Sequence, residues 1–460
     1  MNDLTISFKN KLSVVAGAFL GFIGILIGTS LVVTFPVLIN EFHVSLSDIQ
    51  WLSSGYYLVA TIIMSTTAYL MKRIPLKRLF QISSLFFIIG SLIASVAHTI
   101  TILLIGTLLD ALATGIATPL MYQIVFHNIP SVKFGLYTGI VTMIKSFGPA
   151  FGPTYGGILT HLFSWRYIFI CIIPLVIIVL LLGSYAINLN NTIKQAQKFD
   201  FLGFIIFSIT LFLIDFAFSR AGKIGFINIR FWLYIIIGLI FLAIFVFHLK
   251  YAKGKYLNFK ILKQNIVRSR AINFFNLQFV NLSLAFMLPL FAEEVLHLNS
   301  MDAGLLLLPG ALIGALVSPL SGKFYDKKGA FITLSISNIC LFFGVLLYLI
   351  FTYSLTGILI CIIYILFRLG YTFGFGNILS DAGHYVDSHS RSDVSSLFNT
   401  LQQYAGSLGT NLMASIISIY ELLISKKSYA VMFGSHIGLY LLIVILIINI
   451  IITGFHSKRS

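Results

Sequence analysis

Charged side chains are scarce in this sequence. Asp, Glu, Lys and Arg make up 10% of the 460 residues, whereas soluble domains carry roughly 25%. With 58% hydrophobic residues and a mean hydropathy of +0.99, so little charge cannot cover a water-facing surface of this size. The composition therefore excludes an ordinary soluble chain and predicts a protein covered mostly by the lipid bilayer.

Sequence signatures of catalysis and of cofactors are also missing. Three cysteines, Cys171, Cys340 and Cys361, lie inside apolar runs without metal-ligand or CxxC spacing, so they are interpreted as small buried side chains. The ten histidines form no HExxH or paired-ligand pattern. No GK[ST] phosphate loop and no serine nucleophile elbow are found. The sequence predicts no metal site, no cofactor, no direct use of ATP and no enzymatic activity.

Long apolar runs fill the chain. A membrane helix needs about 20 apolar residues to cross a core of about 30 Å. The run after Lys9 and Lys11 begins like a signal peptide, but it is too long for one and is predicted to be a retained helix. Fourteen runs are counted, at approximately 12–39, 51–71, 79–97, 101–123, 134–160, 166–187, 201–219, 231–249, 271–292, 303–322, 330–353, 356–379, 393–420 and 432–454. The fold class predicted is an all-α integral membrane protein.

The basic residues sort between the two sides that these helices define. If both termini are cytoplasmic, the inner loops and tails hold 22 of the 30 Lys and Arg residues, and the outer loops hold 6. Cytoplasmic loops of membrane proteins are enriched in Lys and Arg. The net charge of +16 thus indicates topology in a cytoplasmic membrane and gives no reason to expect nucleic acid as a partner.

Two short basic loops suggest an internal repeat. The loop 72–78 follows the second run, and the loop 322–329 follows the tenth. Each comes after the second helix of a six-helix block if the runs at 201–219 and 231–249 form a central insert. Two bundles with a substrate path between them are typical of transporters. The domains predicted are a six-helix bundle over 1–190, two additional helices over 191–255 and a second six-helix bundle over 256–460.

The densest motif lies in the fifth run. Four glycines and two prolines fall within ten residues: Gly148, Pro149, Gly152, Pro153, Gly156 and Gly157. Such a helix is tolerated in a membrane because neighbouring helices satisfy the kinked backbone, and glycine permits close approach. A plain packing face is the alternative interpretation.

These and other residues resemble a known family. Gly148 to Gly157 is similar to the antiporter motif of the major facilitator superfamily, and Trp165 to Phe169 with Pro174 resembles the sixth helix of its fourteen-helix drug:proton antiporter subfamily. Similar stretches are Pro289 to Leu296, Gly322 to Gly329 and Ser396 to Gln403. The resemblance implies a major facilitator fold and export of drugs in exchange for protons. It implies a gating loop role for Asp326 and for Lys72 and Arg73.

The sequence departs from the subfamily where protons are expected to bind. The first helix has Ile27 where the subfamily usually carries Asp, and Lys72 stands at the usual Asp of the first gating loop. In the fourth helix, Asp110 replaces the usual Gln and the nearby arginine is lost. The usual proton site therefore cannot be carried over.

Ionisable residues inside the apolar runs are candidates for function by default. Asp110 and Lys145 both fall near the middle of the bilayer, on consecutive helices, and are predicted as a proton-coupling pair, with a structural ion pair as the alternative. Arg368 is a candidate for pairing with an acid, for contacting substrate in the cavity, or only for binding backbone carbonyls. Glu293 lies at an outer helix end, where it attracts cations or is simply solvated. Asp215 is interpreted as a local pair with Arg220.

Polar side chains extend the candidate cavity. Asn276, Asn399 and Gln402 indicate a path for substrate or hydrogen bonds between helices. The function predicted is a secondary active multidrug exporter that exchanges protons for small lipophilic or antimicrobial compounds and works as a monomer. An exporter of a specific metabolite, lipid or peptide with the same fold stays open, as does a membrane channel or sensor.

Overall fold

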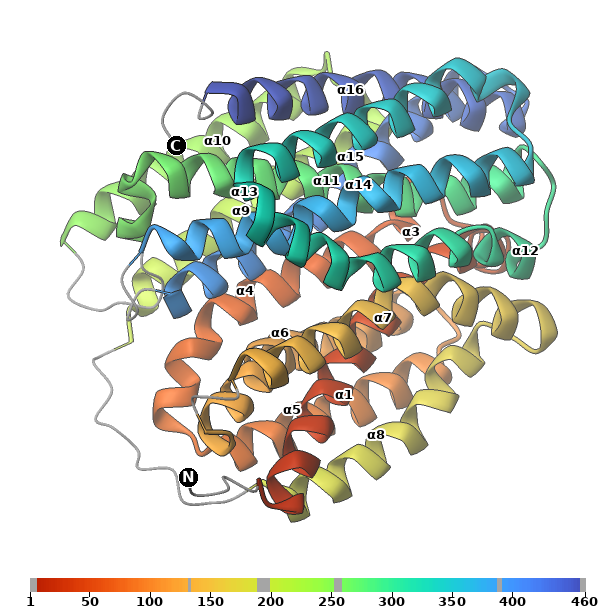
Figure 1. The fold of residues 1–460 in the computed structure, drawn as a ribbon. Coiled ribbons are helices and arrows are strands. Elements are labelled where there is room, and N and C mark those ends of the chain that lie inside the picture. Colours follow the sequence, from red (N-terminus) through yellow and green to blue (C-terminus); the bar gives the residue numbers. More distant parts are fainter. Residues whose placement is uncertain (1–5, 131–133, 188–198, 252–258, 387–390, 456–460) are drawn as a thin grey trace.

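Helices account for nearly all of the residues that the computed structural model describes (Figure 1). The structure describes residues 6–130, 134–187, 199–251, 259–386 and 391–455. In chain order the helices are α1 (Phe8–Ser30), η1 (Val32–Thr34), α2 (Phe35–Phe42), α3 (Leu46–Ile49), α4 (Trp51–Arg73), α5 (Leu76–Ser95), α6 (Ile100–Asn128), α7 (Phe134–Leu162), α8 (Arg166–Ala186), α9 (Phe201–Ile224), α10 (Ile229–Tyr251), η3 (Phe259–Lys263), α11 (Asn265–Glu294), α12 (Ser300–Leu305), α13 (Leu308–Phe351), η4 (Thr352–Ser354), α14 (Gly357–His384), α15 (Arg391–Leu423) and α16 (Lys427–Phe455).

Local sequence explains where several helices begin. Ser7, Thr99 and Thr356 lie directly before α1, α6 and α14, and each side-chain oxygen accepts a hydrogen bond from a backbone N–H of the first turn. Asp200 does the same for α9 by accepting from the Gly203 N–H. These side chains satisfy donors that have no partner within the helix.

The helices are long and apolar enough for a membrane. In the described part of the chain, ten helical segments have the length and composition of a membrane span. Helices α4, α7 and α15, with 23, 29 and 33 residues, are of similar length. Large apolar side chains cover the outer face of α10, among them Trp232, Leu233 and Ile236. The chain is a multi-pass membrane protein. Fourteen crossings stay a prediction.

Helix α13 is too long to cross a bilayer once. Its 44 residues would span about 66 Å at 1.5 Å per residue, twice the hydrocarbon thickness. The helix breaks at Gly329, whose φ of 76° and ψ of 174° are not helical. A positive φ is adopted readily by glycine and rarely by other residues. The break falls at the end of the predicted loop 322–329.

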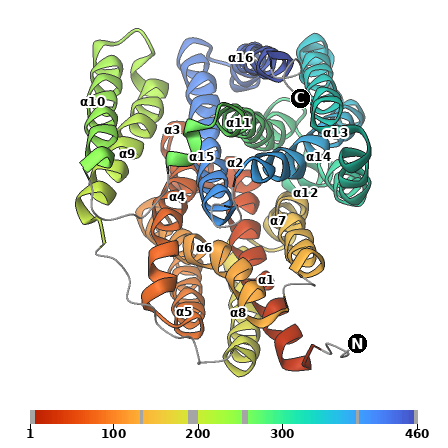
Figure 2. The ribbon, with the colours of Figure 1, turned by 60° about the vertical axis from the view of Figure 1, so that its left-hand side comes forward.

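The helices pack in two groups with a hairpin beside them (Figure 2). Helices α1 to α8, here called the N-terminal group, pack mainly on one another. Helices α11 and α13 to α16 do the same, and together with α12, which packs mainly on α7, they are here called the C-terminal group. Helices α9 and α10 form a hairpin in which α9 packs on α15 and touches α4. The groups meet through α4 against α15 and α7 against α12 and α13.

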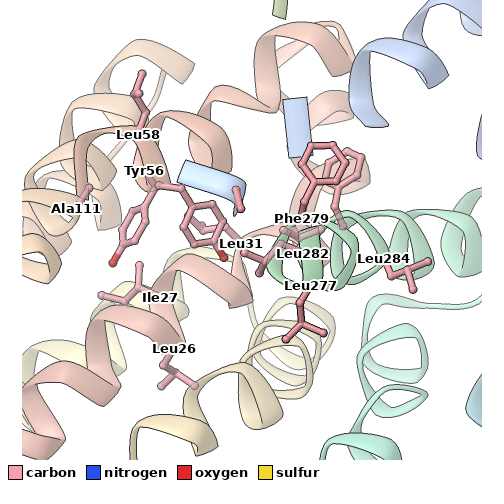
Figure 3. Packing of buried hydrophobic residues seen from close by; sticks show 14 of the residues in the cluster. Leu26, Ile27, Leu31, Tyr56, Leu58, Ala111, Leu277, Phe279, Leu282 and Leu284 are labelled. Carbon is pink, nitrogen blue, oxygen red and sulfur yellow. The ribbon is translucent and has the colours of Figure 1, made fainter. Parts of the chain in front are cut away.

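One buried apolar cluster continues across both groups. Figure 3 shows part of it, with Leu26, Ile27 and Leu31 from the end of α1 and Leu277 and Leu282 from α11. Since lipid supplies no hydrophobic drive between helices, this close packing and the hydrogen bonds described below hold the helices together.

Candidate functional site

A small pocket lies where the two groups of helices meet. Residues of the N-terminal group come from α1, η1, α4 and α7, and residues of the C-terminal group come from α11, α14 and α15. The lining residues are Thr29, Val32, Ser53, Tyr57, Pro149, Pro153, Asn281, Leu282, Ala285, Phe286, Tyr364, Arg368 and Thr410. Any relative motion of the two groups must change its shape.

Arg368 brings a positive charge to this pocket. It is buried, its Nη1 donates to Asn281 Oδ1 over 3.0 Å, and its guanidinium lies 4.5 Å from the ring centre of Tyr371. Its Nε has no hydrogen-bond partner among the described residues, and none of the ion pairs found there includes it. A buried guanidinium stays charged and strongly favours an acceptor. The predicted cavity candidate therefore lines a pocket, with a donor available.

Lys145 links the two groups near the same interface. It is 6% exposed, and its Nζ donates to Asn399 Oδ1 over 3.1 Å, so that α7 is tied to α15. Both residues were singled out from the sequence, but not as partners of each other.

Asp110 faces α5 and not Lys145. It is fully buried between α5 and α6, with both carboxyl oxygens 3.4 Å from Ser91 Oγ. A Cβ added to Gly90 would lie 2.5 Å from Asp110 Oδ1, so only glycine leaves room for this carboxyl group. The described residues contain no ion pair between Asp110 and Lys145. The structure therefore does not bring the predicted pair together in this conformation.

The glycines of α7 make two different contacts. A Cβ on Gly148, Gly152 or Gly156 would clash with α1, at Ile25, Thr29 or the Ser30 backbone. On Gly157 it would clash with the backbone of Ser300, across the group boundary in α12.

Two hydrogen bonds close the same junction between the groups. Thr154 Oγ1 donates to the Gly304 carbonyl over 3.2 Å, and Ser300 Oγ donates to the Gly157 carbonyl over 3.3 Å. The end of the glycine motif thus joins α7 to α12 of the other group.

The remaining candidates lie away from the pocket. Asn276 donates to Asn449 Oδ1 of α16 over 3.2 Å, which is a hydrogen bond between helices. Gln402 is half-buried, and Glu293 has a buried Oε1 without a partner among the described residues. Asp326 is exposed, and Arg73 lies over the ring of Tyr69. The side chain of Lys72 is outside the described part.

Sequence reasoning missed a buried ion pair. Arg270 of α11 pairs with Asp381 of α14, both less than 10% exposed, and Tyr325 donates to Asp381 Oδ1 over 3.1 Å. The predicted run 271–292 begins directly after Arg270 and so leaves it in an inner loop, whereas α11 begins at Asn265. Asp381, an acid at the end of an apolar run, was the signal in the sequence for a buried pair. Its partner Arg270 lies 111 positions away, so the pair could not be recognised.

Asp215 also differs from its predicted role. Its Oδ2 lies 2.7 Å from Ser407 Oγ of α15, whereas Arg220 lies over the ring of Phe216. The predicted local pair of Asp215 with Arg220 is wrong, because the side chain of Asp215 points into the α9–α15 contact and not along its own helix.

Comparison with known proteins agrees with this architecture. The chain is 28% identical to the lincomycin resistance protein LmrB of Listeria monocytogenes over 405 residues, covering 86% of this chain and 84% of that protein. It is 27% identical to the riboflavin transporter RibZ of Clostridioides difficile over 309 residues, covering 67% and 66%. The crystal structure of a bacterial homolog of the lysosomal transporter Spinster, inward-facing and unoccupied, superposes over 98% of both chains with a TM-score of 0.73 at 14% identity.

The family follows from a match over most of the chain. A model of the Major Facilitator Superfamily matches residues 17–410. The fourteen-helix subfamily stays a prediction from motifs. The chain belongs to the Major Facilitator Superfamily and is a membrane transporter of that superfamily.

Proposed function

We propose that this transporter is a secondary active exporter that exchanges protons for small lipophilic or antimicrobial compounds. The observation that carries the proposal is the pocket between the two groups, where Tyr57, Phe286 and Tyr364 supply an aromatic wall and Arg368 supplies a directed donor. Apolar walls with few placed polar groups are typical of small-molecule sites. The drug resistance named for LmrB supports the choice of substrate class.

The proposed architecture is fourteen crossings with both termini in the cytoplasm of a bacterial-type cell. Two six-helix bundles, 1–190 and 256–460, rock about the pocket, and 191–255 forms the two additional helices. With this orientation the α7–α12 contact lies on the outer side, so the structure represents a conformation closed to the outside. The transporter acts as a monomer in the bilayer.

For proton coupling we keep Asp110 and Lys145 as the proposed residues. Asp110 is a fully buried acid of the N-terminal group, and Lys145 bonds across the groups to Asn399. When the groups separate, Lys145 must leave Asn399. A direct pair with Asp110 then requires α6 and α7 to shift. Asn276, Gln402, Glu293 and the loop residues Lys72, Arg73 and Asp326 keep their proposed roles in the path and the gates.

A metabolite exporter is the second candidate, favoured by the relative that is named a riboflavin transporter. The aromatic wall of the pocket suits a planar ring compound as well as a drug. An exporter of one metabolite should protect cells from few toxic compounds.

The test is a growth panel in a bacterium deprived of its own exporters. Lincomycin, ethidium and other lipophilic toxic compounds are compared in cells with the transporter, with Gly156→Leu and without it, at equal membrane levels. Wild type should raise the inhibitory concentration of several compounds, and the variant should not. Protection from none, together with release of riboflavin into the medium, would replace the drug proposal with the metabolite one.

A further inference from the structure

Asp215 lies on the hairpin helix α9, in the half nearer the Ile224 end. The helix continues to Ile224, so Asp215 lies nine residues, or about 14 Å, from that end. The residue is fully buried inside the protein, whereas Arg220 and Lys223 toward the end of the helix are exposed.

Hydrogen bonds around Asp215 join three separate helices. Ser407 Oγ of α15 lies 2.7 Å from Asp215 Oδ2 of α9 and 2.7 Å from the Ser54 carbonyl oxygen of α4. A Cβ on the adjacent Gly406 would lie 3.2 Å from the ring of Tyr57, so α4 and α15 approach closely here. One hydroxyl group therefore connects the hairpin, the N-terminal group and the C-terminal group.

Counting donors favours a protonated Asp215 in this arrangement. A serine hydroxyl has one hydrogen, yet Ser407 Oγ is within bonding distance of two oxygens that both accept if Asp215 is ionised. Protonated Asp215 resolves the conflict, because its O–H donates to Ser407 and Ser407 donates to the Ser54 carbonyl. An ionised Asp215 would leave either the carboxylate or the carbonyl without that hydrogen.

The surroundings offer no compensating charge. Asp215 Oδ1 has no partner, and no ion pair in the described part of the chain includes this acid. The titratable group that interacts with Asp215 is Tyr404 of α15, which donates to the Leu211 carbonyl. On α10, Tyr234 packs on the neighbouring Phe216, and on α15 Asn411 donates to the Asp215 backbone carbonyl. On α9 itself, Arg220 lies over Phe216, and Lys223 bonds Asp48 of α3 over 2.6 Å. An isolated buried carboxylate is strongly disfavoured.

We propose that Asp215 is a proton-binding site of the transport cycle, and that its protonation holds α4 against α15. Loss of the proton turns the Ser407 hydrogen toward the carboxylate, and the bond from α15 to the Ser54 carbonyl is lost. Because α4 and α15 belong to opposite groups, this favours their separation. The hairpin thus supplies a second acid to the cycle. The role of Asp215 in transport rests on the proposed proton-driven function; the binding of a proton by Asp215 does not.

The first test is infrared spectroscopy of the purified transporter. The wild-type spectrum minus that of Asp215→Asn should show the C=O stretch of a protonated carboxylic acid at neutral pH. Ser407→Ala should shift this band, because its hydrogen-bond acceptor is removed. A carboxylate band in the difference spectrum would overturn the assignment.

The second test measures the distance between spin labels on the two groups. The three cysteines are replaced, and labels are placed at the exposed positions Arg78 and Lys327. Going from mildly acidic to mildly alkaline pH should shorten the distance in the parent, because both labels lie on the inner side and the bundles close there as the outer α4–α15 contact opens. Asp215→Asn should lose this change.

Asp48→Asn is the matched control for the label experiment. This change removes another acid that contacts α9, but the side chain of Asp48 is 44% exposed. Because Asp48 is not part of the buried arrangement, the pH-dependent change in distance should persist. No change in the parent, or an unaltered change in Asp215→Asn, would overturn the proposal. Neither experiment uses a transported compound. A failure of the Asp215 proposal can therefore be distinguished from a failure of the export proposal.

Discussion

The contact of Gly157 with α12 predicts a measurable shift between conformations. A Cβ on Gly157 would clash with the Ser300 carbonyl oxygen and would lie 2.9 Å from the Ser300 carbonyl carbon and 3.2 Å from Met301 Cα. All three are backbone atoms, so α12 must move as a unit to restore ordinary contact. Overpacking of this kind costs about 1–3 kcal/mol.

This cost falls on the closed conformation only, if α7 and α12 separate when the pocket opens to the outside. A differential free energy of about 1–3 kcal/mol changes the ratio of two conformations by roughly 5–150-fold. Gly157→Ala should therefore favour the open conformation by that factor. Gly139→Ala is the matched control, because Gly139 is exposed on the same helix with no atom within 4 Å of an added Cβ.

The assay is the rate at which an impermeant thiol reagent reaches a cysteine at Ser53, a buried residue of the pocket. The reagent is applied from outside to cells carrying the cysteine-replaced protein at matched membrane levels. Gly157→Ala should raise the rate, and Gly139→Ala should leave it unchanged. Equal rates in the two variants would refute the idea that this contact seals the pocket.

Three further predictions concern charge and energy. Asp110→Asn should stop proton-driven export, and the double change Asp110→Leu, Lys145→Met should stop it as well; efflux at near wild-type rate by either would remove the pair from coupling. Collapsing the proton gradient while ATP is preserved should halt efflux from loaded cells, whereas continued uphill efflux would point to another ion. Burial raises the pKa of Asp48, but hydrogen bonds from Lys223 and Ser45 and the charge of Lys223 outweigh it, so the pKa is lowered from 3.8. The folded state thus gains stability above the ordinary pKa and loses it as the pH falls through the lowered one. Melting temperatures of wild type and Asp48→Asn should accordingly differ at neutral pH and converge in acid; a gap that persists in acid would contradict this.

Hydrophobic runs predicted the positions of the helices well, because lipid demands about 20 apolar residues wherever a helix crosses. They predicted helix ends poorly. Polar turns such as Arg220 to Lys223 stay helical, since backbone hydrogen bonding continues after the apolar run has stopped. For the same reason the predicted run 271–292 leaves Arg270 in a loop, although α11 begins at Asn265.

Depth along a helix was predictable, but direction around it was not. Asp110 and Lys145 were expected to meet because both lie near the middle of consecutive helices. In the structure, α6 turns Asp110 toward Gly90 of α5, while α7 turns Lys145 toward Asn399. Which faces meet depends on contacts between residues far apart in the sequence, such as the 254 positions between Lys145 and Asn399. These contacts cannot be predicted from a single sequence.

The apolar outer face of α10 makes the hairpin sensitive to the thickness of the bilayer. Helix α10 has 23 residues and is about 35 Å long, a few ångströms more than a typical hydrocarbon core, so it must tilt to match. Its packing within the protein is almost entirely against α9. A tilt imposed by lipid therefore passes to α9, and through it to the contact of Asp215 with Ser407. Transport rates measured in liposomes of graded acyl-chain length should vary more for wild type than for Asp215→Asn, which would make membrane thickness a regulator of this transporter.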